Sequence, residues 1–223
     1  MRKLFGRLFS APSPLEEGRR LLKHGRHLEA AHLLKGHVDA GAADHSIVEL
    51  YAQVLSVQQR HEEALELARS LMSRGHTGPT VHVLLGTCLE ALSDVEGAIV
   101  SYRQALETNP RHNEATTRLC RLLCSRKEKA EALQIVDEAL RLQPRDVDLI
   151  FCRGNVKFAL GDISGARDDF EAVLEAEPTH RHAMSNLAVV ATAQKDLAVA
   201  EQWLQKALEQ SPEDLDCRLR LAH

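Results

Sequence analysis

The composition limits both the fold and the kind of partner. The chain has 223 residues, of which 44% are apolar and 4% aromatic, so a folded core must consist mainly of Leu, Ala and Val. That mixture suits close helix packing better than a sheet sandwich. The formal net charge is −4, and the absence of a global basic field argues against nucleic acid as the main partner.

The cysteines and the hydropathy indicate a compartment. Five scattered cysteines without a CxxC pair favour free thiols in a reducing environment. No apolar run approaches the roughly 18 residues that a membrane span needs. We therefore expect a cytoplasmic protein, with peripheral membrane contact left open by the first ten residues.

Residues 1–10, MRKLFGRLFS, form a short basic amphipathic segment. On a helix its four apolar residues share one face and its three basic residues lie largely on the other. The candidate membrane-anchor residues are Arg2, Lys3, Leu4, Phe5, Arg7, Leu8 and Phe9. Such a segment can lie on an anionic membrane or dock on a partner. The other interpretations are a frayed end, a short helix that covers the first repeat, or a cleaved presequence.

From residue 11 onward the chain is periodic. Pro110, Pro144, Pro178 and Pro212 follow one another at intervals of 34 residues without insertion or deletion. A fixed period of this length marks an array of one stacked supersecondary unit. Extending the period predicts six units: 11–44, 45–78, 79–112, 113–146, 147–180 and 181–214.

Other columns support the same register. The twentieth place of every unit is Ala, and the eighth place is always small: Gly18, Ala52, Gly86, Cys120, Gly154 and Ala188. Short side chains allow two helices to approach closely. Helical spacing of apolar residues and the terminal prolines predict a helix–turn–helix unit that ends at the proline.

These columns resemble the tetratricopeptide repeat. The match is clearest in unit 79–112, with Leu85, Gly86, Ala98, Tyr102 and Pro110. The resemblance implies an all-α, right-handed α-solenoid superhelix of about six such repeats. Residues 215–223 would add a C-terminal capping helix, since solenoids need capped ends. Unit 147–180 departs from the pattern, with Arg153 and Lys157 where apolar residues are usual.

Catalytic and metal-binding patterns are missing from the sequence. It contains no Gly-rich phosphate loop, no HExxH and no GxSxG. The twelve histidines show no spacing that brings three or four suitable ligands together. We therefore expect no enzyme activity of its own, no metal and no cofactor.

The resemblance also implies a binding surface, because in that family the first helices of the units line a concave groove. Transferring the groove places gives these candidates: Arg118, Arg121, Phe151, Asn155, Phe158, Asn186 and Arg220. Family members that clamp a terminal carboxylate use lysines where this chain has Phe151 and Asp216, so that ligand is not expected. Asn155 and Asn186, 31 residues apart, are expected to face one hollow and to bond a peptide backbone, with arginines preferring acidic groups.

The leading functional prediction is a non-catalytic scaffold or adaptor that holds a peptide or helix of a partner protein in the groove. Two alternatives remain at this point. One is a membrane-peripheral assembly factor recruited through residues 1–10. The other is a regulatory subunit of an enzyme carried on another chain.

Overall fold

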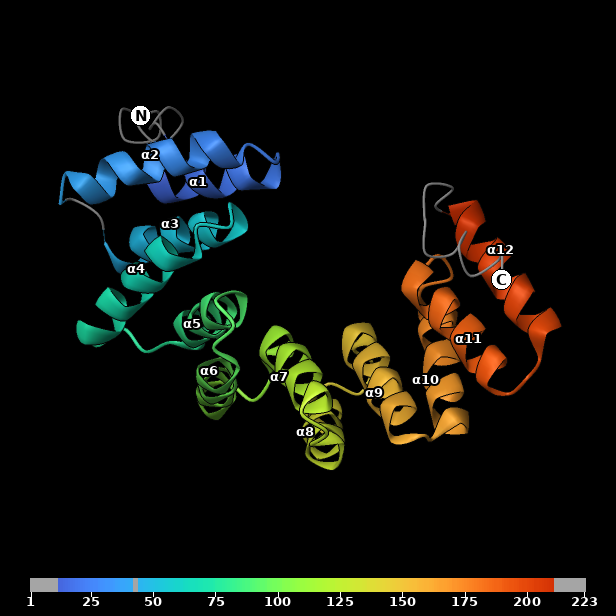
Figure 1. The fold of residues 1–223 in the computed structure, drawn as a ribbon. Coiled ribbons are helices and arrows are strands. Elements are labelled where there is room, and N and C mark those ends of the chain that lie inside the picture. Colours follow the sequence, from blue (N-terminus) through green and yellow to red (C-terminus); the bar gives the residue numbers. More distant parts are fainter. Residues whose placement is uncertain (1–11, 42–43, 211–223) are drawn as a thin grey trace, which may run out of the picture. The chain divides into compact units, whose positions relative to one another are not determined.

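The computed structural model describes residues 12–41 and 44–210, and within these ranges the chain forms twelve α-helices and no strand (Figure 1). The prediction of an all-α fold is thereby confirmed. None of the helices in the described ranges combines the length and apolarity that crossing a bilayer requires. The chain divides into two compact units, residues 1–109 and 110–223.

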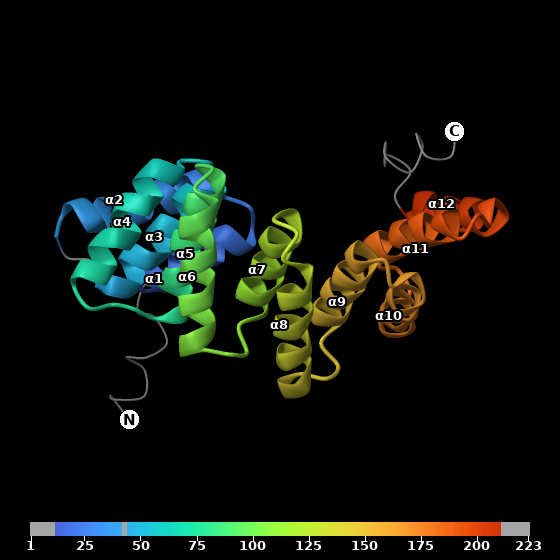
Figure 2. The same ribbon diagram turned by 60° about the horizontal axis from the view of Figure 1, so that its bottom comes forward.

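The first unit contains three helix pairs. Its helices are α1 (Pro14–Lys23), α2 (His27–Asp39), α3 (His45–Val57), α4 (His61–Ser73), α5 (Pro79–Ala91) and α6 (Val95–Thr108). Each helix packs on the next one, and α3 also packs on α1 and α5 (Figure 2). The first helix of each pair therefore lies beside the first helix of the neighbouring pair.

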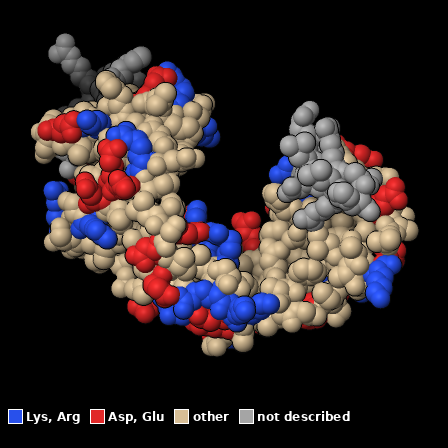
Figure 3. All heavy atoms as spheres, viewed as in Figure 1, with Lys and Arg blue, Asp and Glu red and all other residues tan. Residues whose placement is uncertain are grey.

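The second unit repeats this arrangement. Its helices are α7 (Asn113–Ser125), α8 (Lys129–Leu142), α9 (Val147–Leu160), α10 (Ile163–Ala176), α11 (Arg181–Ala193) and α12 (Leu197–Gln210). Consecutive helices pack on one another, and α7 packs directly on α9. In the view of Figure 3, acidic and basic side chains are interspersed, in keeping with the small net charge.

A close contact between the two helices of a pair explains the small residues in the eighth column. A Cβ atom on Gly86 would lie 2.6 Å from the ring of Tyr102, and one on Gly154 would lie 2.7 Å from the ring of Phe170. Both rings are fully buried. Any larger residue at these glycines would force the ring or the helix to move, so the ring at the 24th place requires glycine at the eighth.

The turn within each pair has the same backbone conformation in all six repeats. The fifteenth residue has a positive φ throughout: Gly25, Gln59, Ser93, Lys127, Gly161 and Lys195. The next amide bonds back to a carbonyl five residues earlier, for example Glu128 N to Leu123 O at 2.9 Å. This is the Schellman ending of a helix, which favours glycine at the left-handed position. Four repeats keep the geometry without glycine.

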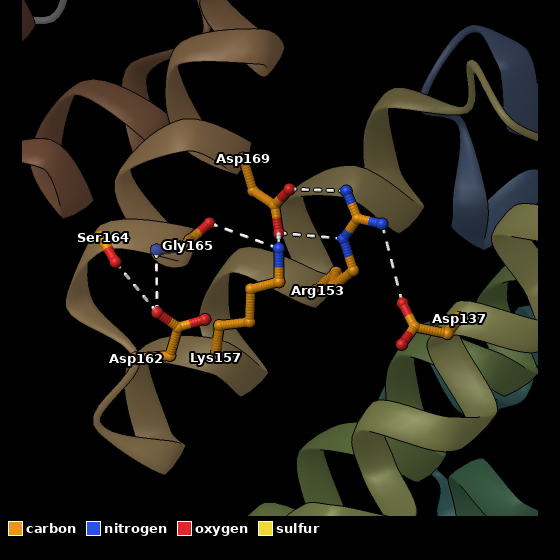
Figure 4. Close-up of polar contacts among 7 residues, drawn as sticks. All are labelled: Asp137, Arg153, Lys157, Asp162, Ser164, Gly165 and Asp169. Carbon is orange, nitrogen blue, oxygen red and sulfur yellow. Dashed lines mark hydrogen bonds and ion pairs between the residues drawn. The ribbon is translucent and has the colours of Figure 1, made fainter.

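An ionic network around a buried carboxylate links α9 to α8 and α10 (Figure 4). Asp169 on α10 is 3% exposed, and it accepts two hydrogen bonds from Arg153, at 2.6 and 3.0 Å. The Lys157 Nζ atom lies 2.9 Å from the same carboxylate. Arg153 also reaches Asp137 on α8, with 3.6 Å between Nη1 and Oδ1. The hydrogen bonds that Arg153 donates to Asp169 raise the pKa of Arg153 above its ordinary value.

This network replaces the apolar contact that the preceding repeat makes at the same places. Places 7 and 11 hold buried leucines in the preceding repeat, Leu119 and Leu123, whereas they hold Arg153 and Lys157 here. Burying charges is costly unless they are paired, and the pairs formed here offset that cost only while all partners are present. The departure seen in the sequence is thus compensated by Asp169.

The Nδ1 atom of His82 is buried without a polar partner among the described residues, as are those of His27 and His61. His82 on α5 is 6% exposed. Burial disfavours the imidazolium ion and lowers the pKa of His82 from its ordinary value of 6.5, although Glu107 acts in the opposite direction. His82 is therefore neutral in the folded protein at neutral pH.

The left-handed turns predict a reciprocal pair of substitutions. Lys127→Gly should raise the free energy of unfolding by about 0.5–1 kcal/mol, because glycine adopts this φ without the strain of a Cβ atom. Gly161→Ala should lower it by about 1–2 kcal/mol, since no atom crowds this site and the cost is in the backbone alone. Urea denaturation measures both. Equal stability of all three proteins would show that the turns carry no strain.

For the ionic network, Arg153→Met should destabilise the second unit by about 2–4 kcal/mol, because Asp169 then remains buried with Lys157 alone. The triple variant Arg153→Leu, Lys157→Leu, Asp169→Ile restores an apolar contact. Its free energy of unfolding should lie within about 1 kcal/mol of that of the natural protein. Denaturant titrations give both values. A triple variant as unstable as the single one would mean that lost packing, and not unpaired charge, causes the loss of stability in Arg153→Met.

For His82, stability should fall with acidity. Below pH 6.5 the unfolded chain takes up a proton on this residue that the folded protein does not, so the free energy of unfolding decreases as pH drops through that value. His82→Val should remove this contribution. The difference in unfolding free energy between the two proteins is measured between about pH 7.5 and 5.5. A difference that does not change with pH would contradict the assignment.

Candidate functional site

The second unit contains an open pocket between α7 and α9. Its volume is about 850 Å³, and both walls are first helices of neighbouring pairs. It is lined by Asn113, Glu114, Thr117, Arg118, Cys120, Arg121, Cys124, Asp148, Phe151, Cys152, Asn155 and Val156. The exposed lining is mainly apolar, so the pocket suits an apolar side chain more than a charged group.

The two walls are tied together where their helices begin. His112 caps α7 by accepting a hydrogen bond from Ala115 N at Nδ1, and Asp146 caps α9 by accepting one from Leu149 N. Asn113 then donates from Nδ2 to the second carboxylate oxygen of Asp146 at 2.5 Å. Helix capping and the link between walls therefore use the same carboxylate, which fixes the spacing of the pocket.

Three thiols form the floor. Cys120 and Cys152 are buried, and Cys124 is half-buried. The neighbouring Cys152 thiol and burial raise the pKa of Cys120, and burial followed by Cys152 raises the pKa of Cys124. The Cys120 thiol donates to the carbonyl oxygen of Ala132 at 3.3 Å. Cys120 and Cys124 therefore stay protonated near neutral pH, and the half-buried Cys124 presents an uncharged, polarisable sulfur to the pocket.

Phe151 forms the aromatic side of the pocket. It is half-buried, and its ring lies 5.6 Å from that of Phe170 and 4.9 Å from that of His180, tilted in both cases. Such tilted contacts are favourable for aromatic rings. His180 also accepts a hydrogen bond from Ala183 N and so caps α11. The ring of Phe151 is thus held by α10 and by the N-cap residue of α11, and it is a preformed part of the pocket.

The rim carries both signs of charge. Arg118 donates to Glu114 at 2.9 Å one turn away on α7, and Arg121 is exposed on the same helix. The lining contains two basic and two acidic residues, Arg118, Arg121, Glu114 and Asp148. The pocket therefore has no net formal charge, and part of the attraction that its arginines have for acids is met within the protein.

The two asparagines expected to face one hollow are hydrogen-bonded to each other. Asn186 on α11 donates from Nδ2 to Asn155 Oδ1 at 2.7 Å. An amide has two N–H donors and an oxygen with two lone pairs, so this bond uses only part of the capacity of each group. It orients the N–H group of Asn155 and the carbonyl of Asn186 as a fixed donor and acceptor.

The site residues expected from the sequence do not all lie in the pocket. Arg118, Arg121, Phe151 and Asn155 line the pocket, and Asn186 joins them only through Asn155. Phe158, expected on an apolar groove surface, does not line this pocket, and like Phe151 it packs partly buried against the core cluster that contains Phe170. Arg220 and residues 1–10 lie outside the described residues.

Sequence reasoning missed the thiol floor. Cys120 was assigned to the small core column, which its complete burial supports, but its role beneath a pocket needs Cys124 and Cys152 as well. The available signal was spacing: Cys152 follows Cys120 by 32 residues, close to the interval between the two asparagines. Residues at such intervals lie on facing parts of neighbouring first helices.

The chemistry of the pocket is that of binding. The thiols of Cys120 and Cys124 beneath it are protonated. Its polar groups form an amide–amide hydrogen bond and an ion pair. Within residues 12–41 and 44–210, no group of three or more His, Cys, Asp or Glu side chains is arranged to hold a metal ion. The arrangement can hold an apolar group and hydrogen-bond a neighbouring backbone.

Comparison with curated proteins gives one partial relative. The human protein O-mannosyl-transferase TMTC3 is 29% identical over 113 residues, which cover 50% of this chain and 12% of the transferase. The alignment therefore concerns a small part of that protein.

Solved structures share the fold. PilF of Pseudomonas aeruginosa superposes with a TM-score of 0.75 at 15% identity, covering 94% of this chain and 96% of that one. YrrB, described as a TPR protein with an unusual peptide-binding site, has a TM-score of 0.62 at 20% identity and covers 86% of this chain and all of its own. At such identities the likeness shows the fold alone.

Family models cover most of the chain. One tetratricopeptide repeat model matches residues 15–75 and 153–214, and a second matches residues 89–150. Together with the repeated helix pairs and their glycine–ring contacts, these matches show that the chain belongs to the tetratricopeptide repeat family, whose α-solenoid is generally a non-catalytic scaffold.

Proposed function

We propose that this protein is an adaptor that holds a short segment of a partner protein in the pocket between α7 and α9. The observation that carries the proposal is an apolar, thiol-lined floor beside a paired amide donor and acceptor. An apolar side chain of the ligand enters the pocket, while the ligand backbone bonds to Asn155 and Asn186. This combination selects one type of apolar residue in the ligand and does not require a long matching ligand sequence.

The floor favours a bulky apolar side chain. A volume of about 850 Å³ exceeds the needs of one aliphatic residue, so an aromatic ring or a large aliphatic side chain with its neighbours fills it better. Thiols contact aromatic rings favourably through their polarisable sulfur. We therefore assign most of the affinity to this anchor.

Charge has a smaller role in the proposal than the sequence suggested. The attraction of Arg118 and Arg121 for an acidic ligand is opposed by Glu114 and Asp148 on the same rim. Binding should therefore weaken only slightly as salt increases. An acidic ligand residue remains compatible with the site, but it does not dominate recognition.

Two further features support a cytoplasmic adaptor without its own catalysis. The described cysteines, Cys88, Cys120, Cys124 and Cys152, are all free, as in a reducing compartment. YrrB, which shares the fold, is described by a peptide-binding site. We propose the same class of ligand here.

The test begins with peptides selected from a random display library on the intact, immobilised protein. Selected peptides should share one large apolar residue. Cys124→Phe, which fills the pocket from a half-buried position, should reduce their affinity at least tenfold. Asn155→Ala with Asn186→Ala should cost about 1–3 kcal/mol, the range for unmade hydrogen bonds. Isothermal calorimetry measures the affinities.

A matched control lies on the second helix of the same repeat. Gln134 and Glu138 form an exposed hydrogen bond on α8 and line no part of the pocket. Gln134→Ala with Glu138→Ala should leave the affinity unchanged. If both pocket variants bind the selected peptides as tightly as the natural protein while remaining folded by circular dichroism, the binding site lies elsewhere and the proposal is wrong.

A further inference from the structure

The first repeat carries a second pocket, formed by α1, α2 and the turn between them. Its volume is about 560 Å³. It is lined by Glu17, Arg20, Leu21, Arg26, Leu28, Glu29, His32 and Leu33. Leu28 is 79% exposed, although the same place in the other five repeats holds Glu, Ala or Ser. An apolar side chain is thus presented where the rest of the array has polar or small ones.

The repeat register shows which face this pocket occupies. Glu17 stands at the seventh place, which holds the buried residues Tyr51, Leu85, Leu119 and Leu187 in four later repeats. In the remaining repeat that place is Arg153, which contacts Asp137 of the preceding repeat. Arg153 also pairs with Asp169 of its own repeat at 2.6 Å, so the seventh place lies against both its own second helix and the preceding repeat. In the first repeat, no described residue covers it from the side of a preceding repeat.

Glu17 shows what kind of group this face lacks. One carboxylate oxygen pairs with Arg20 at 2.6 Å, whereas the other, Oε2, is buried and has no hydrogen-bond partner among the described residues. A buried carboxylate oxygen needs a donor, and a cationic side chain is the strongest one. Arg20 and Arg26 already pair with Glu17 and Glu29 on this face, so the one unsatisfied oxygen among its described residues is Glu17 Oε2, and an occupant with one cationic side chain beside apolar ones would satisfy it.

We propose that residues 1–10 of the same chain occupy this pocket and cap the array. Their sequence supplies the required chemistry, because four apolar residues alternate in helical spacing with three basic ones and no acidic residue is present. Phe5 and Phe9 cover Leu28 and Leu33, and a basic side chain pairs with Glu17. Solenoids need such a cover on their terminal repeats.

The chain enters α1 in a position that allows this. A capping box fixes the entry: Ser13 N donates to Glu16 Oε2 at 2.9 Å, and Glu16 N donates to Ser13 Oγ at 3.2 Å. Glu17 is three residues beyond Pro14, the start of α1, or about 4.5 Å along the helix axis. Ten residues in helical form span about 15 Å, which matches the length of α1.

Photo-crosslinking in the full-length protein tests the contact directly. With p-benzoylphenylalanine in place of Phe5 or Phe9, irradiation should yield monomeric products joined to the peptide that contains Leu28 and Leu33, identified by mass spectrometry. Leu28→Ser, a change at an exposed site that the fold tolerates, should reduce that yield several-fold. Products joined only between two chains, or a yield unaffected by Leu28→Ser, would overturn the proposal.

Hydrogen exchange gives an independent readout. Phe5→Ser with Phe9→Ser should accelerate amide exchange in α1 and α2 several-fold and leave α9 and α10 unchanged. Unchanged exchange in α1 and α2 would overturn the cap. Vesicles of phosphatidylserine and phosphatidylcholine distinguish a membrane anchor: if residues 1–10 crosslink to lipid there, and never to α2 in vesicle-free buffer, the segment is an anchor and the proposal is wrong.

Discussion

In the third and fifth repeats, a contact between a glycine and a ring sets the distance between the two helices. Gly86 faces Tyr102 and Gly154 faces Phe170 so closely that no Cβ atom fits between them. The large residue fills the space that the small one leaves, and the pair behaves as one packing unit. In these two repeats the contact sets the spacing of the helix pair, and the eighth place is small in the other four repeats as well.

The pocket follows from the stacking of neighbouring helix pairs. First helices lie beside one another, so residues of α7 and α9 that are about 32 places apart meet over a common floor. The helix α9 is then constrained on two sides. Its pocket side carries Phe151, Cys152 and Asn155, and its other side is held by the charge cluster around Asp169. A wall fixed in this way needs little reorganisation when a ligand binds.

Much of the fold could be predicted because it depends on period and residue size. The 34-residue interval and the small eighth column are visible in the chain itself. The left-handed turns were not foreseeable, because only Gly25 and Gly161 mark a position that Lys127 and Lys195 also occupy. There the backbone conformation is imposed by the packed helices on either side and not by the local residue.

The candidate site was foreseeable only in part, because its properties depend on which side chains meet. Sequence spacing brought Asn155 and Asn186 to neighbouring helices, but it could not show that they bond to each other. Nor could it show that Phe151 lines the pocket and Phe158 does not, although both rings pack against the same core cluster. Such distinctions arise from a fraction of a helical turn, which a column pattern does not resolve.

The ionic network has a consequence for the order of the repeats. Arg153 of the fifth repeat meets Asp137 at the 25th place of the fourth. The same place holds Lys35, Arg69 and Arg103 in the first three repeats. Exchanging the fourth repeat for any of these would set two cations against each other beside a buried carboxylate. The modules of this array are therefore not interchangeable: charge specifies which neighbour the fifth one accepts.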